Sequence, residues 1–172
     1  MIKNSLTLTL VMAVILTAGC VHQAPLTTEH SIAIDPEILG LWERVPGESK
    51  GDPTEDRMVI LKWSGTEYVA QNPMGEKGDF YRAYPVEIGG RQFIQAVSLG
   101  SSWGEIYEGE RVDYPILTYR IVEGILIIST LSPRVIDINI TDTDILREAV
   151  LANINRQDLF DPPAHFRRIE NQ

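Results

Sequence analysis

The feature that most limits the fold of this chain is a series of paired apolar runs joined by glycine-containing turns. The runs 57–63 and 68–71 flank Ser64-Gly65, the runs 80–88 and 92–99 flank Gly89-Gly90, and the runs 116–122 and 125–131 flank Glu123-Gly124. Glycine readily adopts the positive φ of tight hairpin turns, so each pair is typical of a β-hairpin. Three hairpins in succession predict an antiparallel meander.

Further runs extend this pattern in both directions. Residues 38–45 and 164–169 predict a first and a last strand, and 135–140 alternates in a way that suggests one more. Eight or nine short strands favour closure, because a closed barrel has no exposed strand edges. The predicted fold class is therefore mainly β, with a small antiparallel barrel occupying residues 35–172.

One helix is predicted near residues 143–154. Thr141 and Asp144 match the S/T-x-x-D/E pattern of a helix N-terminus. An apolar side follows at helical spacing, formed by Ile145, Leu146, Ala149, Val150 and Ala152. The barrel is thus expected to carry a single helix just before its last strand.

The first twenty residues have the organisation of an export signal. Lys3 supplies a positive charge, residues 6–18 form an uncharged and mostly apolar run, and Thr17-Ala18-Gly19 precedes Cys20. A membrane-spanning helix needs ~20 apolar residues, so this run is too short to span. Its length suits the apolar core of a secretory signal that ends in small residues.

This segment resembles a bacterial lipoprotein signal peptide, with Thr17 standing where that family most often has leucine. The resemblance implies cleavage before Cys20, addition of a diacylglyceryl group to its thiol, and, from Val21 in place of an aspartate, sorting to the outer membrane. Two or more acyl chains hold a protein firmly on a bilayer. The alternatives are an ordinary secretory signal with a chance cysteine and an uncleaved anchor helix.

Three regions follow from this reading: a signal peptide over 1–19, a lipidated cysteine with a flexible tether over 20–34, and the barrel domain. The tether is expected to be polar and solvated. Removing the signal changes the net charge from −9 to −10, which disfavours nucleic acid and anionic lipid as partners. Because Cys20 is the only cysteine, its acylation excludes disulfides, thiol catalysis and cysteine metal sites.

A second resemblance concerns the two ends of the barrel. Gly40-Leu41-Trp42 in the first strand and Arg167-Arg168 in the last resemble the lipocalins, in which a tryptophan closes the barrel and a late arginine stacks on it. The chain is also similar over 38–169 to small uncharacterised bacterial lipoproteins that end in a comparable Phe-Arg-Arg. Trp42 alternatively serves as an ordinary core aromatic, with Arg167 and Arg168 in solvent. Both interpretations give these residues a structural role, so neither makes them a binding site.

The loop over 100–113 is the strongest candidate for a ligand site. It is long for a meander and carries Trp103 and Tyr107. Together with the loop over 46–55 it is expected to form the mouth of a cup, where small barrels hold ligands. The alternative is a solvated loop whose Trp103 folds back onto the end of the barrel.

No pattern in the chain indicates catalysis, a cofactor or a metal. Its two acidic clusters, Glu48–Asp56 and Glu105–Asp113, lack the spacing of a calcium loop. There is no G-x-S-x-G motif, and His165 is the only histidine beyond the tether. An enzyme is therefore the least favoured hypothesis, and it would require a carboxylate beside His165 in a cleft.

Two hypotheses remain for this predicted envelope lipoprotein. One is binding of a small apolar or amphipathic ligand inside the barrel, and the other is docking of another envelope protein without a ligand. The first requires a hollow interior, so a core filled by aromatic side chains would exclude it. The candidates for such filling are Trp42, Trp63, Phe80, Tyr81, Phe93 and Tyr119. The second requires an exposed apolar patch.

Overall fold

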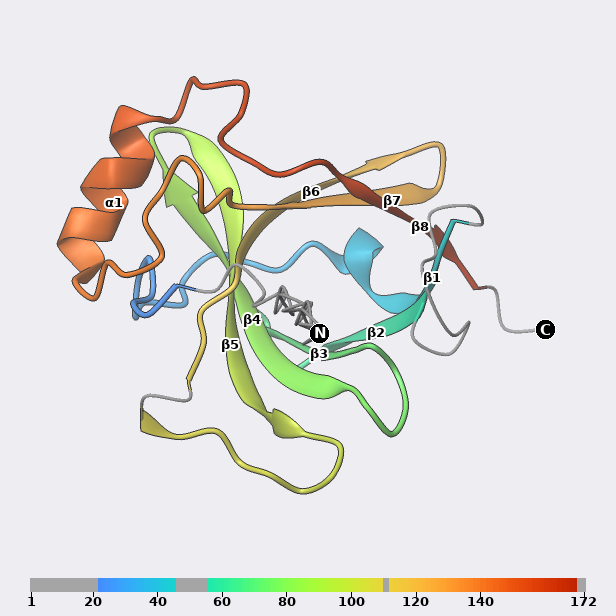
Figure 1. Cartoon of the computed structure of the whole chain (residues 1–172). Coiled ribbons are helices and arrows are strands. Elements are labelled where there is room, and N and C mark those ends of the chain that lie inside the picture. Colours follow the sequence, from blue (N-terminus) through green and yellow to red (C-terminus); the bar gives the residue numbers. More distant parts are fainter. Residues whose placement is uncertain (1–21, 46–55, 110–111, 170–172) are drawn as a thin grey trace, which may run out of the picture.

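The computed structural model describes residues 22–45, 56–109 and 112–169. Within these ranges, antiparallel strands β1 to β8 close into a barrel in sequence order (Figure 1). The strands are β1 (Gly40–Arg44), β2 (Arg57–Lys62), β3 (Tyr68–Asn72), β4 (Asp79–Ile88), β5 (Arg91–Ser101), β6 (Ile116–Val122), β7 (Ile125–Thr130) and β8 (Ala164–Arg168). A 3-10 helix, η1 (Pro36–Ile38), precedes β1, and α1 (Thr143–Ala152) lies between β7 and β8. The predicted mainly-β barrel with one late helix is confirmed.

Hydrogen bonding between the first and last strands closes the barrel. Trp42 pairs with Arg168 and Glu43 pairs with Arg167 across β1 and β8. The three predicted hairpins are the pairs β2–β3, β4–β5 and β6–β7. The pairing of β5 with β6 is short, because only Ile94 and Gln95 pair directly with that strand.

Three local expectations are wrong. Residues 135–140 form turns rather than a strand, and Ile136 is buried in the core beside α1. The helix N-cap is Asp142 rather than Thr141. The Asp142 carboxylate accepts hydrogen bonds from the backbone N–H groups of Asp144 and Ile145, both at 2.9 Å. Ile145 itself is exposed, so the packed side of the helix runs through Leu146 and Val150.

The antiparallel order divides the connections between the two ends of the barrel. The connections after β1, β3, β5 and β7 lie at one end, which we call the loop end. The short turns after β2, β4 and β6 lie at the other end, together with η1, and we call this the closed end. Trp63, directly after β2, and Trp103, two residues after β5, therefore lie at opposite ends of the barrel.

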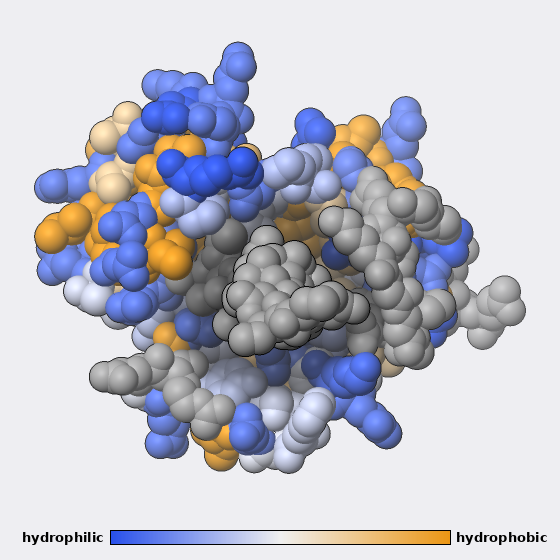
Figure 2. Space-filling view, viewed as in Figure 1, coloured by the Kyte–Doolittle hydropathy of each residue, from blue (hydrophilic) through white to orange (hydrophobic). Residues whose placement is uncertain are grey.

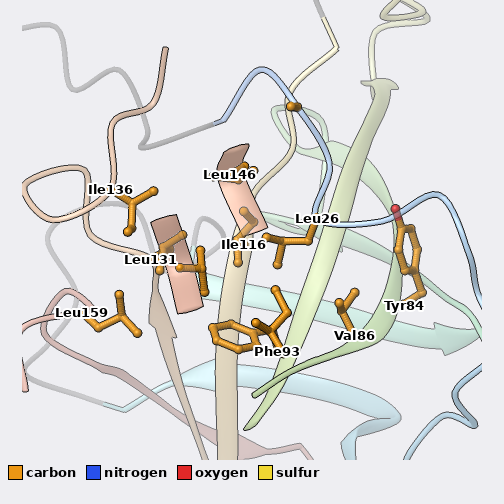
Figure 3. Packing of buried hydrophobic residues seen from close by; sticks show 12 residues of the cluster. Leu26, Tyr84, Val86, Phe93, Ile116, Leu131, Ile136, Leu146 and Leu159 are labelled. Carbon is orange, nitrogen blue, oxygen red and sulfur yellow. The ribbon is translucent and has the colours of Figure 1, made fainter. Parts of the chain in front are cut away.

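Two hydrophobic cores stabilise this arrangement. The inner core fills part of the barrel and includes Trp42, Leu126 and Phe166. The outer core lies between the outer face of the β4–β5 hairpin, α1 and residues 131–159, and Figure 3 shows Phe93 and Leu146 within it. The β4–β5 hairpin is consequently buried on both of its faces.

Residues 22–34 form a strap that is packed against the barrel, which corrects the expectation of a solvated tether. His22, Ala24 and Leu26 are buried, and the last two belong to the outer core. Backbone N–H groups of the strap donate to Gln95 Oε1 (from Leu26, 2.6 Å) and to the carbonyl of Gly65 (from Ile34, 3.0 Å). The three buried residues alternate along the chain, but so short an alternation within a polar segment did not indicate packing in the sequence.

A buried ionic cluster holds the middle of the strap. The Glu67 carboxylate, which is 5% exposed, accepts hydrogen bonds from both His30 and Arg82. The His30 ring also stacks on Tyr84, with ring centroids 3.6 Å apart. The Arg82 guanidinium and then His30 hold the pKa of Glu67 below its usual range. The strap is thus joined to β4 and to Glu67, directly before β3, by hydrogen bonding and ring stacking as well as by apolar contact.

His22 is expected to make stability depend on pH. Its ring is fully buried and neither nitrogen has a hydrogen-bond partner among the described residues. Burial lowers its pKa below the usual 6.5, and the nearby Asp137 offsets this only in part. The unfolded chain therefore binds a proton on acidification before the folded chain does, so stability is lost as pH falls below about 6.5.

Urea unfolding at pH 7.5 and at lower pH tests this expectation. The variant His22→Leu should lose less stability on acidification than the parent protein. Gln23→Leu, at the exposed neighbouring position, is the matched control and should keep the parent dependence. Equal pH dependence in the parent and His22→Leu would contradict the prediction.

Candidate functional site

The barrel contains a partly open cavity of about 300 Å³. Side chains of the inner core line most of it, because alternate residues of each strand point into the barrel. Its apolar lining includes Met58, Ile60, Ala83, Ala96, Leu117 and Phe166. The interior of this protein is therefore hollow rather than filled.

Small side chains on three neighbouring strands account for the space. Ala70, Ala83 and Ala96 line the cavity from β3, β4 and β5, and Ala83 pairs directly with Ala96. Protein interiors are otherwise close-packed, so a wall of alanines opposite ordinary core residues leaves volume that larger side chains would occupy. Nothing in the sequence pattern marked these alanines, since their inward direction depends on strand register.

Trp42 and Arg168 close the barrel at the end opposite the loops. The indole is fully buried, and its Nε1–H donates to the Ile38 carbonyl at 2.8 Å. The Arg168 guanidinium lies 4.4 Å from the centre of the Trp42 ring and donates to the carbonyls of Glu37 and Leu39. Of the two candidate arginines, Arg168 therefore takes the stacked position.

Gly40 makes this closure sterically feasible. Its φ is +139°, and a Cβ at this position would meet the Arg168 Nη1 atom at 2.6 Å. Arg167, one residue earlier in β8, points to the barrel exterior, where its Nη2 lies 2.6 Å from Glu43 Oε2. The Gly-x-Trp motif and the final arginines thus form one structural unit, as the sequence suggested.

Asp35 connects this end of the barrel to the strap. Its carboxylate accepts hydrogen bonds from the Tyr119 hydroxyl at 2.8 Å and from the Glu37 backbone at 2.9 Å. Its own backbone N–H donates to the Tyr68 hydroxyl at 2.8 Å. Burial raises the pKa of both tyrosines, so they stay neutral hydrogen-bonding groups. Tyr68 reaches from this network to the cavity wall.

Polar groups of the cavity gather toward the loop end. Asn72, Tyr81 and Thr130 lie near the strand termini there, together with Arg44. The Arg44 guanidinium lies over the Phe166 ring at 5.0 Å, and its Nε is 3.7 Å from Asp56. Burial raises the pKa of Tyr81 to about 12. The cavity is thus apolar in its depth and polar toward one end.

The aromatic residues that could have filled the interior are dispersed. Trp42 is buried in the inner core, and Tyr81 and Tyr119 pack against that core. Phe93 belongs to the outer core. Trp63 and Phe80 are 65% and 40% exposed. The condition that would have excluded ligand binding is therefore not met.

Trp103 and Tyr107 do not reach the cavity. Trp103 is 71% exposed and lines a shallow surface hollow with Glu76, Lys77 and Ser102. The Tyr107 hydroxyl donates to Asp79 Oδ1 at 3.0 Å, which fastens the loop to β4. The loop over 46–55, the other expected part of the mouth, lies outside the described residues, as does Cys20.

The side chains that line the cavity are mostly apolar. The described residues that line it include Arg44 and two tyrosines but no histidine or carboxylate. His165 lies between Ala164 and Phe166, which both face the cavity, so its side chain points to the barrel exterior. Across the described part of the chain, no three His, Cys, Asp or Glu residues are grouped as metal ligands.

The chain was compared with protein-family models, with curated proteins and with solved structures. None of the three comparisons found a match. Among the residues that the structure describes, no helix has the length and apolar character needed to cross a bilayer. The class defined here is thus a closed antiparallel β-barrel with a hollow apolar interior.

Proposed function

We propose that this protein is a lipid-anchored envelope protein whose barrel binds a small apolar or amphipathic molecule. The observation that carries the proposal is the cavity of about 300 Å³ inside the barrel. That volume is at the lower end of the range of ligand pockets, ~300–1,000 Å³. A closed end and an apolar wall are the features that such a ligand requires.

The distribution of polar groups favours one orientation of the ligand. An apolar portion would lie in the depth of the cavity among Ala83, Ala96 and Ile94. A polar portion would remain toward the loop end, within reach of Asn72, Tyr81 or Arg44. Burying apolar area contributes ~25 cal/mol per Å², whereas burying an unpaired polar group costs free energy. The ligand class is therefore amphipathic or neutral and apolar.

The anchor rests on the signal-like N-terminus. The apolar run over 6–18 followed by Thr17-Ala18-Gly19-Cys20 supports acylation at Cys20, and Val21 supports the outer membrane as its destination. An acyl chain of the anchor would keep the barrel close to a source of amphipathic molecules. Docking of another envelope protein is the alternative role.

Filling the cavity should remove binding without unfolding the barrel. Ala96→Phe places a ring into the lumen, where it occupies volume that a ligand would need. We expect it to weaken binding of the fluorescent probe anilinonaphthalene sulfonate by about tenfold or more, which corresponds to ~1.4 kcal/mol. Overpacking costs ~1–3 kcal/mol of stability, less than the ~5–15 kcal/mol of a typical domain, so the barrel should stay folded. Gln92→Phe, at an exposed position of the same strand, is the matched control and should bind as the parent does. Probe titration followed by fluorescence gives both affinities.

Native mass spectrometry of the purified domain identifies a natural ligand directly. We expect a co-purified adduct in the parent protein and in Gln92→Phe, and its loss in Ala96→Phe. Probe binding that is equal in all three proteins, with no adduct in any of them, would contradict a ligand inside the barrel.

A further inference from the structure

We propose that an apolar patch on the loop end of the barrel rests on the membrane surface, and that the strap fixes this orientation. The patch consists of Phe80, Leu99, Trp103 and Ile106. The inference goes beyond ligand binding, and it rests on the proposed anchor at Cys20. It predicts which side of the barrel faces the bilayer.

The strap decides where the anchored chain reaches the barrel. The backbone of His22 pairs with that of Tyr114, whose N–H donates to the His22 carbonyl at 3.0 Å. Tyr114 directly precedes β6 on the loop-end side, whereas Ile34, at the other end of the strap, is bonded to Gly65 at the closed end. The strap therefore runs from the loop end to the closed end of the barrel.

This packing shortens the connection to the bilayer. A free tether of fourteen residues would reach ~50 Å, but only Val21 stands between Cys20 and the packed His22, so the two Cα atoms are at most about 7 Å apart. An acylated Cys20 would thus hold the barrel against the membrane at the point where the strap begins. The barrel could not rotate its closed end toward the bilayer without undocking the buried His22 and Leu26.

Exposed apolar side chains lie on the same end of the barrel. Leu99 follows Ser98, whose backbone N–H donates at 3.0 Å to the carbonyl of Asp113, the residue before Tyr114. Phe80 and Leu99 are 40% and 42% exposed, and Trp103 and Ile106 are 71% and 72% exposed. Phe80 pairs with Gly100, which in turn pairs with Ile106, so the two side chains lie on one face with a glycine between them. Figure 2 shows apolar surface at its lower edge, in the area of the β5–β6 loop of Figure 1.

The composition of the patch fits a bilayer interface. Tryptophan is enriched at the level of lipid headgroups, and exposed apolar patches commonly mark membrane or protein contacts. The loop that carries Trp103 is held in place by Ser102, whose backbone N–H donates to the Gly78 carbonyl at 2.8 Å. The Ser102 hydroxyl, with one proton to donate, lies 2.8 and 2.6 Å from the carbonyl oxygens of Gly75 and Gly78. The acidic Glu105 and Glu108 in the same loop disfavour anionic lipid, so the expected surface is zwitterionic.

Trp63 supplies an internal comparison. It is 65% exposed, similar to Trp103, but it follows β2 at the closed end. Trp42 is fully buried in the barrel and remains in every variant as a constant background. If the strap sets the orientation, lipid should contact Trp103 and leave Trp63 in water.

The experiment uses the acylated full-length product in phosphatidylcholine vesicles with brominated acyl chains, which quench tryptophan on contact. In Trp63→Phe, which keeps Trp103, we expect emission to be quenched relative to unbrominated vesicles. In Trp103→Phe, which keeps Trp63, we expect no quenching by lipid and full quenching of the exposed indole by iodide in the buffer. Intact mass measures acylation of each protein.

Each other outcome overturns the proposal at a defined step. An unmodified Cys20 would remove the anchor on which the orientation depends. Acylation with quenching of Trp63, or of neither residue, would show that the patch does not rest on lipid. If Trp103 stays open to iodide on vesicles and is shielded only in native envelope membranes, the patch docks a protein instead. Probe binding in the barrel is measured separately, so none of these results decides the ligand hypothesis.

Discussion

Replacing Trp42 with alanine is expected to lower the free energy of unfolding by ~3–5 kcal/mol, as is typical for truncation of a buried tryptophan. The indole is fully buried in the inner core. Its loss would also leave the Ile38 carbonyl without its indole donor and Arg168 without the ring beneath its guanidinium. Urea unfolding followed by circular dichroism measures the change in the midpoint.

Two further variants make this result specific. Trp63→Ala removes an equally large but 65% exposed side chain, and its effect should stay within ~0.5 kcal/mol. Trp42→Phe keeps a ring in place, so its free energy of unfolding should lie between those of the parent and Trp42→Ala. If the alanine variant does not fold, Trp42→Phe provides the measurement in its place. Similar losses for Trp42→Ala and Trp63→Ala would contradict the closing role of Trp42.

Replacing Leu26 with alanine is expected to cost ~2–5 kcal/mol, the range for a buried leucine. Leu26 is fully buried in the outer core, although it lies in a segment with the composition of a linker. Its carbonyl also accepts a hydrogen bond from Arg147 of α1 at 2.9 Å, so the strap and the helix stabilise one another. The same unfolding assay measures the loss.

Thr28→Ala is the control within the strap. Thr28 is exposed, and its substitution should change stability by no more than ~0.5 kcal/mol. If Leu26→Ala were equally mild, the strap would contribute little to the domain, and a membrane orientation based on its docking would lose its support.

Local patterns in the sequence were sufficient for the strands and the helix. Turn glycines such as Gly90 and Gly124, which both have a positive φ, act over a few residues, so they indicate hairpins without knowledge of the rest of the chain. Gly65 also marked a hairpin, although its φ is not positive. The contact between the Gly40–Trp42 motif and a late arginine was suggested by a resemblance, which left Arg167 and Arg168 as equal candidates, and the structure places Arg168 on the ring. Residues 135–140 were misread because alternation alone does not distinguish a strand from turns that bury Ile136.

The candidate site was less accessible to such reasoning. Trp103 and Tyr107 attracted attention as aromatic residues in a long loop, but neither lines the cavity. The residues that create the hollow are Ala70, Ala83 and Ala96, which have no distinctive chemistry. Their common direction follows from strand register, and a shift of one residue would turn each of them to the outside.

The sequence by itself determined the hairpins and the late helix, because turn chemistry and strand periodicity are local. The pairing of the two ends that closes the barrel was suggested only by a resemblance. Only the tertiary structure decided that the barrel is hollow and that residues 22–34 are packed. Both depend on contacts between residues far apart in the chain, such as Ala83 with Ala96 and Leu26 with Gln95. The cavity is volume that these contacts leave unfilled, and the order of residues along the chain does not indicate it.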